Sequence, residues 1–513
     1  MMAARPLGGR AAWFTLAVLM TVYVINVIDR QILSILAQDI KADLGITDAD
    51  LGYLYGTAFA IFFSLFGIPF GRLADSWTRG RLIAIGLAFW STMTTLSGLA
   101  TSYGMLTVAR MGVAIGESSA TPAAWSMLAD LFPKDRRALV NALYASASII
   151  GGSLSLPLGG WIAASWTRAY AGGAAPFGLA GWQAAFIAVG TPGLLLALVV
   201  WCLPEPQRGA SDGKPEPAVK PGAWRAFGME LTRIIPPLTL ASAASVPGGL
   251  RRNLMALAGV GAAAVLLAAA TGNIAQWVTY GVGVYAVASW ILLLRAREPE
   301  TYALVWGSRT VVLAIAGFGF LTYFTVSFLF WVSPYALRTF GIGKESVGLA
   351  IGLPTAVMAA LGLIAGGRLS DLWLARDPRG RIFVCMLSAV LPVPFVLGMM
   401  QADTFTVFAL YNGGAVFMLQ LWGASAVSAM QEFVPARLRG TIMATHGLGA
   451  TMLGSALGPY VSGKVATVTG SLQLGLLSTL AICPLVLLLL WGVCRRLSAA
   501  AAVPAVAGNE AQA

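Results

Sequence analysis

Residues 71–81 read Gly71-Arg72-Leu73-Ala74-Asp75-Ser76-Trp77-Thr78-Arg79-Gly80-Arg81, and this charged stretch follows a long apolar run. A shorter version, Gly367-Arg368-Leu369-Ser370-Asp371, follows another apolar run about 300 residues later, and its loop likewise ends in Arg379-Gly380-Arg381. A second echo pairs residues 131–137 with residues 433–439, in the same order and at a similar separation. The repeat predicts two halves that share one plan of helices.

Apolar runs long enough to cross a membrane recur along the whole chain. Of its 513 residues, 58% are hydrophobic and 11% are charged, whereas a soluble protein has roughly twice that share of charge. A helix of about 20 apolar residues spans the hydrocarbon core with every backbone group bonded internally. We therefore predict an all-α membrane protein with about fourteen transmembrane helices, near residues 12–37, 50–72, 81–101, 104–129, 137–164, 181–203, 254–271, 274–294, 309–333, 346–368, 382–401, 404–431, 440–464 and 472–494.

The predicted helices divide the chain into five parts. Residues 1–203 form a six-helix bundle, residues 204–252 a cytoplasmic linker with a surface helix near 222–235, and residues 253–295 an accessory transmembrane hairpin. Residues 296–496 form the second six-helix bundle, and residues 497–513 a disordered tail. The hairpin enters and leaves on one side, so the second bundle keeps its orientation. The sequence gives the hairpin no chemistry, and a lipid-facing accessory pair is the simplest interpretation.

The net charge of +12 is distributed unevenly along the chain. If the N-terminus is cytoplasmic, most Lys and Arg residues lie in cytoplasmic segments. The exceptions are Arg30 and Arg110 within spans and, on the opposite side, Lys41, Arg168, Arg338, Lys344 and Lys464. This asymmetry predicts that both termini are cytoplasmic in a multi-pass protein of a bacterial inner (plasma) membrane. The basic balance then reflects topology and contact with membrane lipids, and we expect no nucleic-acid partner.

The loop at residues 71–81 resembles the loop between the second and third helices of major facilitator transporters, and residues 367–381 resemble its weaker partner. More narrowly, three stretches resemble the Spinster-like branch of that superfamily: residues 26–31 with 41–45, residues 110–117, and residues 130–133. The resemblance implies a major facilitator fold and makes a lysolipid or similar amphiphile a plausible solute. Spinster-like proteins usually have twelve helices, so the additional hairpin is a departure.

Only four ionisable residues lie deep within the predicted spans: Asp29, Arg30, Arg110 and Glu117. A charged group at the bilayer centre costs about 2.5–3.5 kcal/mol even on insertion scales, so these residues need partners, water or a function. At 1.5 Å per residue, Asp29 and Arg110 both lie roughly 10 Å below the outer boundary. We therefore predict an Asp29–Arg110 ion pair bordered by Arg30 and Glu117. It serves either proton or substrate coupling or, alternatively, as a permanent lock; resemblance to Spinster-like proteins favours coupling.

Asp75 and Asp371 lie at cytoplasmic helix ends, where each can accept hydrogen bonds from the first amides of a helix in the opposite half. Such contacts would form a cytoplasmic gate together with Arg79, Arg81, Arg137 and Arg439. The alternative is that these are solvated loop residues. For the solute cavity the candidates combine aromatic and amide side chains: Asn26, Tyr323, Phe324, Trp331, Tyr411, Asn412 and Gln420. The aromatic members can equally face lipid or neighbouring helices.

The sequence contains no phosphate-binding loop, no nucleophile–His–Asp set and no metal-ligand cluster, and it has one histidine. We therefore expect no enzyme activity, no cofactor and no metal. The prediction is a monomeric secondary-active transporter that works by alternating access, is linked to protons and carries a small amphiphilic or organic-anion solute. The alternatives are a proton-coupled drug exporter, and a passive lipid scramblase or membrane sensor.

Overall fold

A computed structural model of the protein describes residues 7–173, 175–209, 211, 217, 219–435 and 438–502. Within these ranges the chain is built from helices and contains no β-strand, so the predicted all-α class is confirmed. The helices of the first half are α1 (Arg10–Leu44), α2 (Asp48–Tyr55), α3 (Thr57–Ala74), α4 (Arg79–Ser97), α5 (Tyr103–Glu117), α6 (Ala120–Leu131), α7 (Arg137–Ala169) and α8 (Gly181–Trp201).

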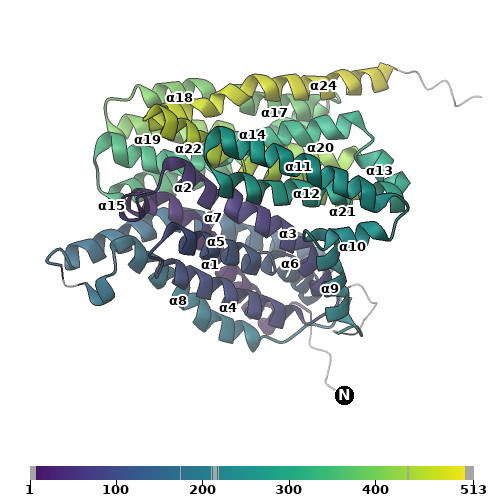
Figure 1. The fold of residues 1–513 in the computed structure, drawn as a ribbon, viewed down its shortest axis with the longest axis horizontal. Helices are drawn as coiled ribbons and strands as arrows, with labels where there is room; N and C mark the ends of the chain where they lie inside the picture. The colour runs from purple at the N-terminus through teal and green to yellow at the C-terminus, as the bar shows by residue number, and fades with distance from the viewer. Residues whose placement is uncertain are drawn as a thin grey trace, which may run out of the picture.

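The middle of the chain and the second half continue the same all-helical plan (Figure 1). The middle contains α9 (Ala223–Ile234), α10 (Thr239–Ala244), α11 (Gly249–Thr271), α12 (Ile274–Arg297) and α13 (Pro299–Val305). The second half contains α14 (Arg309–Phe340), α15 (Lys344–Val347), the π-helix η4 (Gly348–Gly352), α16 (Leu353–Leu374), α17 (Gly380–Val390), α18 (Pro392–Met400), α19 (Phe405–Leu419), α20 (Trp422–Glu432), α21 (Arg439–Gly449), the π-helix η6 (Ala450–Ser455), α22 (Gly458–Thr469), α23 (Leu472–Leu477), η7 (Ser478–Ile482) and α24 (Cys483–Ala502).

Eleven helical segments of the described chain are long and apolar enough, by length and composition, to cross a membrane. The other three predicted spans are also helical, but they are more polar or are interrupted: α4, α5 with α6, and α21 through η6 to α22. The segment α5–α6 breaks between Glu117 and Ala120 and carries three buried charged residues: Arg110, Glu117 and Asp130. The spans that carry buried polar groups therefore have a lower hydropathy than the others.

Two faces of the molecule lie at opposite ends of these spans. We call the side at which α1 begins and α24 ends the terminal side, and the opposite side the distal side. In Figure 1, α9, α10 and α13 lie at the terminal side, on the right, and α2, α15 and α18 lie at the distal side, on the left. The predicted tail begins inside α24, because that helix continues to Ala502; residues 503–513 lie outside the described residues.

The first half and the second half each pack as a bundle. In the first, α4 packs against α5 and α8, and α1 against α7; in the second, α14 packs against α24, and α16 against α19 and α20. Glycine permits the closest of these approaches. A Cβ atom on Gly116 would lie 2.8 Å from the Cβ of Trp90 on α4, so only glycine fits there. This tight packing fixes the position of the next residue, Glu117.

The accessory hairpin only partly matches the lipid-facing pair that the sequence predicts. Helix α11 does face outward, but α12 packs against α3 of the first half and touches η6 of the second. The linker also contributes, because α9 runs along α3: the ring centroids of Trp77 and Trp224 lie 5.0 Å apart, and those of Phe70 and Phe227 5.3 Å apart. The predicted helix near 222–235 is therefore present and lies against the bundle. The domain boundaries at 203, 253 and 296 stay predictions.

Candidate functional site

The four deep ionisable residues lie together in the first half, where α1 meets α5. Arg30 Nη2 donates a 2.8 Å hydrogen bond to Glu117 Oε2. Glu117 is fully buried, whereas 32% of the Arg30 side chain is exposed. Asp29 and Arg110 are also fully buried. Three of the four side chains are therefore enclosed by the protein, and Arg30 is the member that reaches an open surface.

The predicted ion pair between the Asp29 and Arg110 side chains is wrong, because the two charged groups do not bond to each other. Arg110 Nη1 donates to the backbone oxygen of Asp29 at 3.1 Å, and the Asp29 carboxylate instead accepts a 3.1 Å hydrogen bond from Thr94 Oγ1 on α4. The reason is helix geometry: successive side chains on α1 point about 100° apart. Because Arg30 faces α5, Asp29 faces α4. The ion pair of the site is Arg30–Glu117.

Several atoms of this cluster are buried without a hydrogen-bond partner in the protein: Asp29 Oδ1, Glu117 Oε1, and Nε and Nη2 of Arg110. The cations are partly compensated by aromatic rings, since the Arg30 guanidinium lies 4.5 Å from the centroid of Phe59 and that of Arg110 lies 5.6 Å from it. Leaving buried charged groups partly unsatisfied is unfavourable. The cluster thus has unused capacity to bind water, a proton or an anion.

The predicted cavity residues do not gather around this cluster as a group. Asn26 is buried on α1, one turn before Asp29. Trp331 is fully buried, and its Nε1 donates to the Pro459 oxygen at 3.0 Å, so it packs within the second half. Phe324 is buried in the shared core, Tyr323 lies against α22, and Asn412 Nδ2 donates to Thr355 Oγ1 at 3.1 Å.

The last two candidates lie along α19. Tyr411 is 38% exposed and packs on Gly398 near the distal end, and Gln420 is half-buried against Gly362 of α16. The aromatic rings nearest the charged cluster are those of Phe59 and Phe63, which lie 4.5 and 5.0 Å from the Arg30 guanidinium. Tyr55, one turn before Phe59, stacks on Phe330 at 4.1 Å across the two halves. Sequence reasoning missed Tyr55, although its place beside Gly56 at a helix break was a usable signal.

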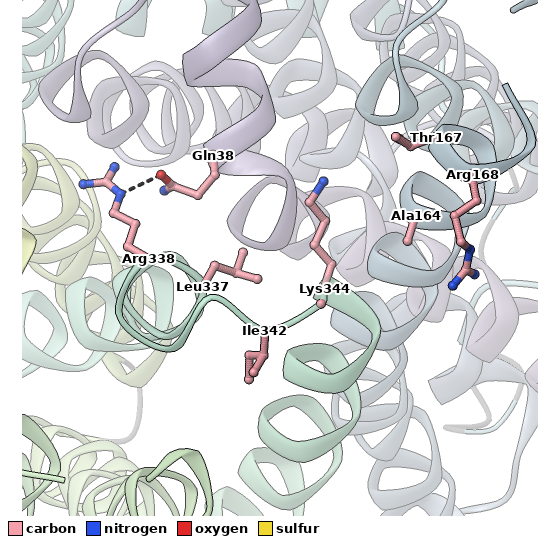
Figure 2. Close-up of a pocket in the computed structure, with 9 residues that line it drawn as sticks. Gln38, Ala164, Thr167, Arg168, Leu337, Arg338, Ile342 and Lys344 are labelled. Carbon is pink, nitrogen blue, oxygen red and sulfur yellow. Dashed lines mark hydrogen bonds between the residues drawn. The ribbon is translucent and has the colours of Figure 1, made fainter. Parts of the chain in front are cut away.

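The distal face is held closed by contacts between the halves. Ser34 Oγ donates to the Phe330 oxygen at 2.6 Å, next to the Tyr55–Phe330 stack. Nearer the surface, Arg338 pairs with Asp48, Lys344 pairs with Asp39, and Arg168 Nη2 lies 2.5 Å from Glu345 Oε1. Figure 2 shows Arg338, Lys344 and Arg168 around a cavity of about 470 Å³ on this face. These cross-half ion pairs form a distal gate.

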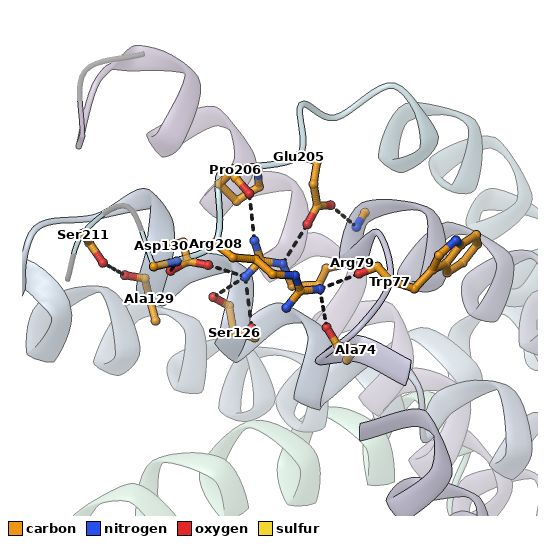
Figure 3. A network of polar contacts seen from close by, with 12 residues as sticks. Ala74, Trp77, Arg79, Ser126, Ala129, Asp130, Glu205, Pro206, Arg208 and Ser211 are labelled. Carbon is orange, nitrogen blue, oxygen red and sulfur yellow. Dashed lines mark hydrogen bonds and ion pairs between the residues drawn. The ribbon is translucent and has the colours of Figure 1, made fainter. Parts of the chain in front are cut away.

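Among the described residues, the ion pairs of the terminal side each stay within one half. Arg79 is fully buried, with Nη1 2.5 Å from Asp130 Oδ2 and Nε 2.8 Å from Glu205 Oε1 (Figure 3). Arg208 donates to the backbone oxygens of Ala74 and Trp77, so the start of the linker is fastened under the same loop. Arg79 therefore acts inside the first half, and not as the cross-half gate residue that the sequence predicts.

Four of the other predicted gate residues make no bond to the opposite half within the described ranges: Asp75, Arg81, Asp371 and Arg439. Asp75 is exposed; Asp371 is 75% exposed and lies 3.7 Å from Arg381 of its own half. The Arg81 guanidinium lies 5.5 Å from the Trp201 ring, Arg137 donates to Ser211, and Arg439 begins α21 exposed. The predicted latch is thus not formed in this conformation, in which the halves are joined at the distal face.

Two related helical bundles, the first of which holds a cluster of buried charges, define a multi-pass membrane transporter. Residues 19–459 match the model of the Major Facilitator Superfamily, and the chain belongs to that family. It is 29% identical, over 90% of its length and 85% of the relative's, to an MFS-type efflux pump of Mycolicibacterium smegmatis. It is 24% identical to Protein spinster of Drosophila melanogaster, over 89% of this chain and 62% of that protein.

Two further comparisons are with a solved structure and with a second bacterial transporter. A bacterial homologue of the human lysosomal transporter Spinster, solved inward-facing and unoccupied, superposes with a TM-score of 0.72 at 21% identity, covering 96% of this chain and 99% of that one. A probable L-galactonate transporter of Escherichia coli is 22% identical over 88% of this chain and 83% of its own length. The predicted major facilitator fold and the resemblance to the Spinster-like branch are confirmed.

Proposed function

We propose that this transporter is secondary-active and works by alternating access, coupling protons to the movement of a small amphiphilic or organic-anion solute. The observation that carries the proposal is the Arg30–Glu117 ion pair, buried on the carboxylate side and partly exposed on the arginine side. We further propose that it is a monomer in a bacterial inner membrane, with the terminal side facing the cytoplasm; the placement of basic residues supports this orientation.

The ion pair offers a simple exchange of partners. When Glu117 takes up a proton it loses its charge, and Arg30 is released from its 2.8 Å hydrogen bond. Arg30 can then hold the anionic group of a solute, while Phe59 and Phe63 offer rings 4.5 and 5.0 Å from its guanidinium. Charge-assisted bonds of this kind are strong in a site of low dielectric, so proton and solute occupancy become linked. Asp29 supplies a second carboxylate in the same cluster.

Two solute classes have specific support. The Arg30 and Arg110 guanidinium groups suit an organic anion, and one relative is named a probable L-galactonate transporter. The aromatic rings beside Arg30 suit an amphiphile, and other relatives carry the names spinster and MFS-type efflux pump. Proton-coupled drug export is therefore the second candidate function. Both classes use the same buried charges, so one assay design serves for both.

The test is gradient-driven uptake in proteoliposomes. A panel of lysophospholipids, aldonates such as galactonate, and cationic dyes is first screened for thermal stabilisation of the purified protein, and the stabilising compound becomes the transport probe. With a pH gradient the wild type should accumulate the probe, Asp29→Asn should lose accumulation but retain exchange, and Glu117→Gln should shift the pH profile of transport. Asp377→Asn, which changes a partly exposed carboxylate of a loop, is the matched control.

Two outcomes would contradict the proposal. If Asp29→Asn and Glu117→Gln both accumulate the probe as the wild type does, with an unchanged pH profile, then the buried carboxylates are structural and coupling fails. If the wild type only equilibrates the probe, the protein is a passive carrier or scramblase. In either case the cross-half ion pairs of the distal face are tested independently, because their test measures distances between the halves and not transport.

The exposed positions of Asp75 and Asp371 suit a latch that forms only when the terminal face closes. We propose that each then caps a helix of the opposite half, as an anion does at a helix N-terminus. Asp75→Asn would in that case favour the conformer that is open at the terminal side.

A further inference from the structure

The accessory hairpin contributes no residue to the charged cluster or to the distal gate, yet its tip touches both halves. Asn273 stands between α11 and α12, at the N-cap position of α12, and its side chain makes no capping hydrogen bond. An N-cap asparagine normally bonds to the first amides of its own helix. Here the side-chain amide is used between the two halves of the transporter.

The partners of Asn273 come from opposite halves. Its Nδ2 donates to Asp50 Oδ1 on α2 at 3.3 Å. Its Oδ1 accepts hydrogen bonds from Tyr460 Oη and Lys464 Nζ on α22, each at 3.3 Å. Lys464 also donates to the oxygen of Thr271, the last residue of α11, at 2.5 Å. One loop of the hairpin thus connects the distal ends of α2 and α22.

Further along α12, side chains on the same face of the helix pack against both halves where these meet. Tyr53 of α2 is hydrogen-bonded to Thr279 at 3.0 Å. One turn further, a Cβ atom on Gly283 would lie 2.6 Å from Ile61 Cδ1 of α3 and 3.3 Å from Met452 Cε of η6. Glycine therefore lets α12 touch both halves at one position. We call the line between α2–α3 and η6–α22, covered by α12, the seam.

One buried group of the seam is unsatisfied. Gln276 is 1% exposed, and neither its Oε1 nor its Nε2 has a partner in the protein. It lies three residues before Thr279 and seven before Gly283, hence on the same helix face. A buried amide without partners disfavours the state in which it is buried. When α2 and α22 separate, this amide reaches water, so Gln276 opposes the closure that Asn273 favours.

We propose that the hairpin α11–α12 is a clasp that holds the distal face closed, because Asn273 must leave one half before α2 and α22 can separate. The proposal rests on alternating access, the conformational part of the proposed function, and not on proton coupling or on the identity of the solute. The hairpin thereby sets how often the transporter opens on its distal side. Gln276 disfavours the closed state and therefore allows the clasp to release.

The test measures the distance between spin labels at Ala42 and Val468, two exposed distal positions of the two halves. The purified full chain is held in lipid nanodiscs, in a background in which the exposed Cys202 is replaced by Ser. Asn273→Ala should raise the fraction of long distances about tenfold, as expected when a bridging group with a charged partner is lost. The matched control is Gln473→Ala, since Gln473 donates only to Met400 of its own half; it should change nothing.

A second variant reads the opposite direction. In the Asp48→Asn background, which we expect to populate the open distal face, Gln276→Leu should lower the fraction of long distances severalfold. Opposite shifts from Asn273→Ala and Gln276→Leu support the clasp. Distance distributions that stay unchanged with Asn273→Ala, or that open with Gln276→Leu, overturn it. Labels at Arg72 and Leu372, on the terminal side, show whether any change is a real switch, because the two faces should move in opposite senses.

Discussion

The distal and terminal faces of this transporter both carry ion pairs, but among the described residues those that join the two halves lie at the distal face. Lys344–Asp39 and Arg338–Asp48 run from one half to the other, whereas Arg79–Asp130 and Arg381–Glu432 stay within one. In alternating access a cross-half pair must break in every cycle, and a pair within one half need not. If the protein works by the proposed alternating access, charge at the distal face sets the conformational equilibrium, and charge at the terminal face sets the stability of each bundle.

The largest expected effect comes from Arg79→Gln, which tests the terminal side of this comparison. Arg79 is fully buried between Asp130 and Glu205, and its Nη1 also donates to the Ser126 oxygen at 3.0 Å. Removing it leaves two carboxylates without their cation, and breaking a buried pair in this way destabilises a protein by about 3–5 kcal/mol. We expect a lower melting temperature of the purified protein, with unchanged spin-label distances at the distal face.

The exposed Arg72, in the last turn of α3, provides the control, because Arg72→Gln should leave the melting temperature within the small range typical of surface substitutions. If Arg79→Gln instead changed the distal distances while the melting temperature stayed constant, the terminal network would act across the halves and the comparison would fail.

The next effect is that of Asp48→Asn at the distal face. Asp48 accepts hydrogen bonds from Arg338 of the second half and from Lys41 of its own, the latter at 2.9 Å. Hydrogen bonds to a charged group contribute about 1.5–3 kcal/mol, so the neutral variant should populate the open distal face about tenfold more. The measurement is the Ala42–Val468 distance distribution, and Asp377→Asn, whose carboxylate bonds only within its own loop, is the control. Equal distributions for Asp48→Asn and wild type would show that Asp48 does not hold the gate.

Much of the fold could be predicted from the sequence, because a membrane span is a local property. Runs of apolar residues define it, and the repeat at residues 71–81 and 367–381 relates the two halves. The cluster of Asp29, Arg30, Arg110 and Glu117 was also predictable, since charges within spans are rare. Which carboxylate meets which arginine was not, because that depends on the rotation of α1 against α4 and α5, and the predicted pairing was wrong.

The distal gate was missed for a different reason. Asp39, Asp48 and Arg338 lie at the ends of spans, where charged residues are common and carry no local signal. Their importance follows from a contact between the halves, some 300 residues apart in sequence. The hairpin shows the same limit: its apolar pattern predicts two helices, and only the packed structure places Asn273 between Asp50 and Lys464.

A smaller effect is expected from Lys344→Gln, which removes the pair with Asp39. Both side chains are partly exposed, 21% for Lys344 and 29% for Asp39, and pairs of this kind contribute about 0.2–1 kcal/mol. The open distal population should rise about twofold. Raising the salt concentration from 0.01 M to 1 M should also raise the open distal population, because dissolved ions screen exposed ion pairs more strongly at the higher concentration. We therefore expect the wild type to open more at high salt, and Lys344→Gln to respond less; an equal salt response in both proteins would exclude this pair from the gate.

The smallest effect concerns Asp377, in the loop between α16 and α17 on the terminal side. Hydrogen bonds from Arg379 lower the pKa of the Asp377 carboxyl to about 2, from an ordinary value near 3.9. A group whose pKa is lower in the folded protein stabilises it above the unfolded pKa, and loses that contribution as pH falls through the folded pKa. The pair should therefore be intact above about pH 4 and lost towards pH 2. Because Asp377 is partly exposed, Asp377→Asn should lower the melting temperature only slightly at pH 6, and the difference from wild type should vanish near pH 2. The wild type could also show distal distances that shift between about pH 4 and pH 2. If Asp377→Asn abolished that shift, the terminal loop would influence the distal gate, and the two faces could no longer be treated as independent.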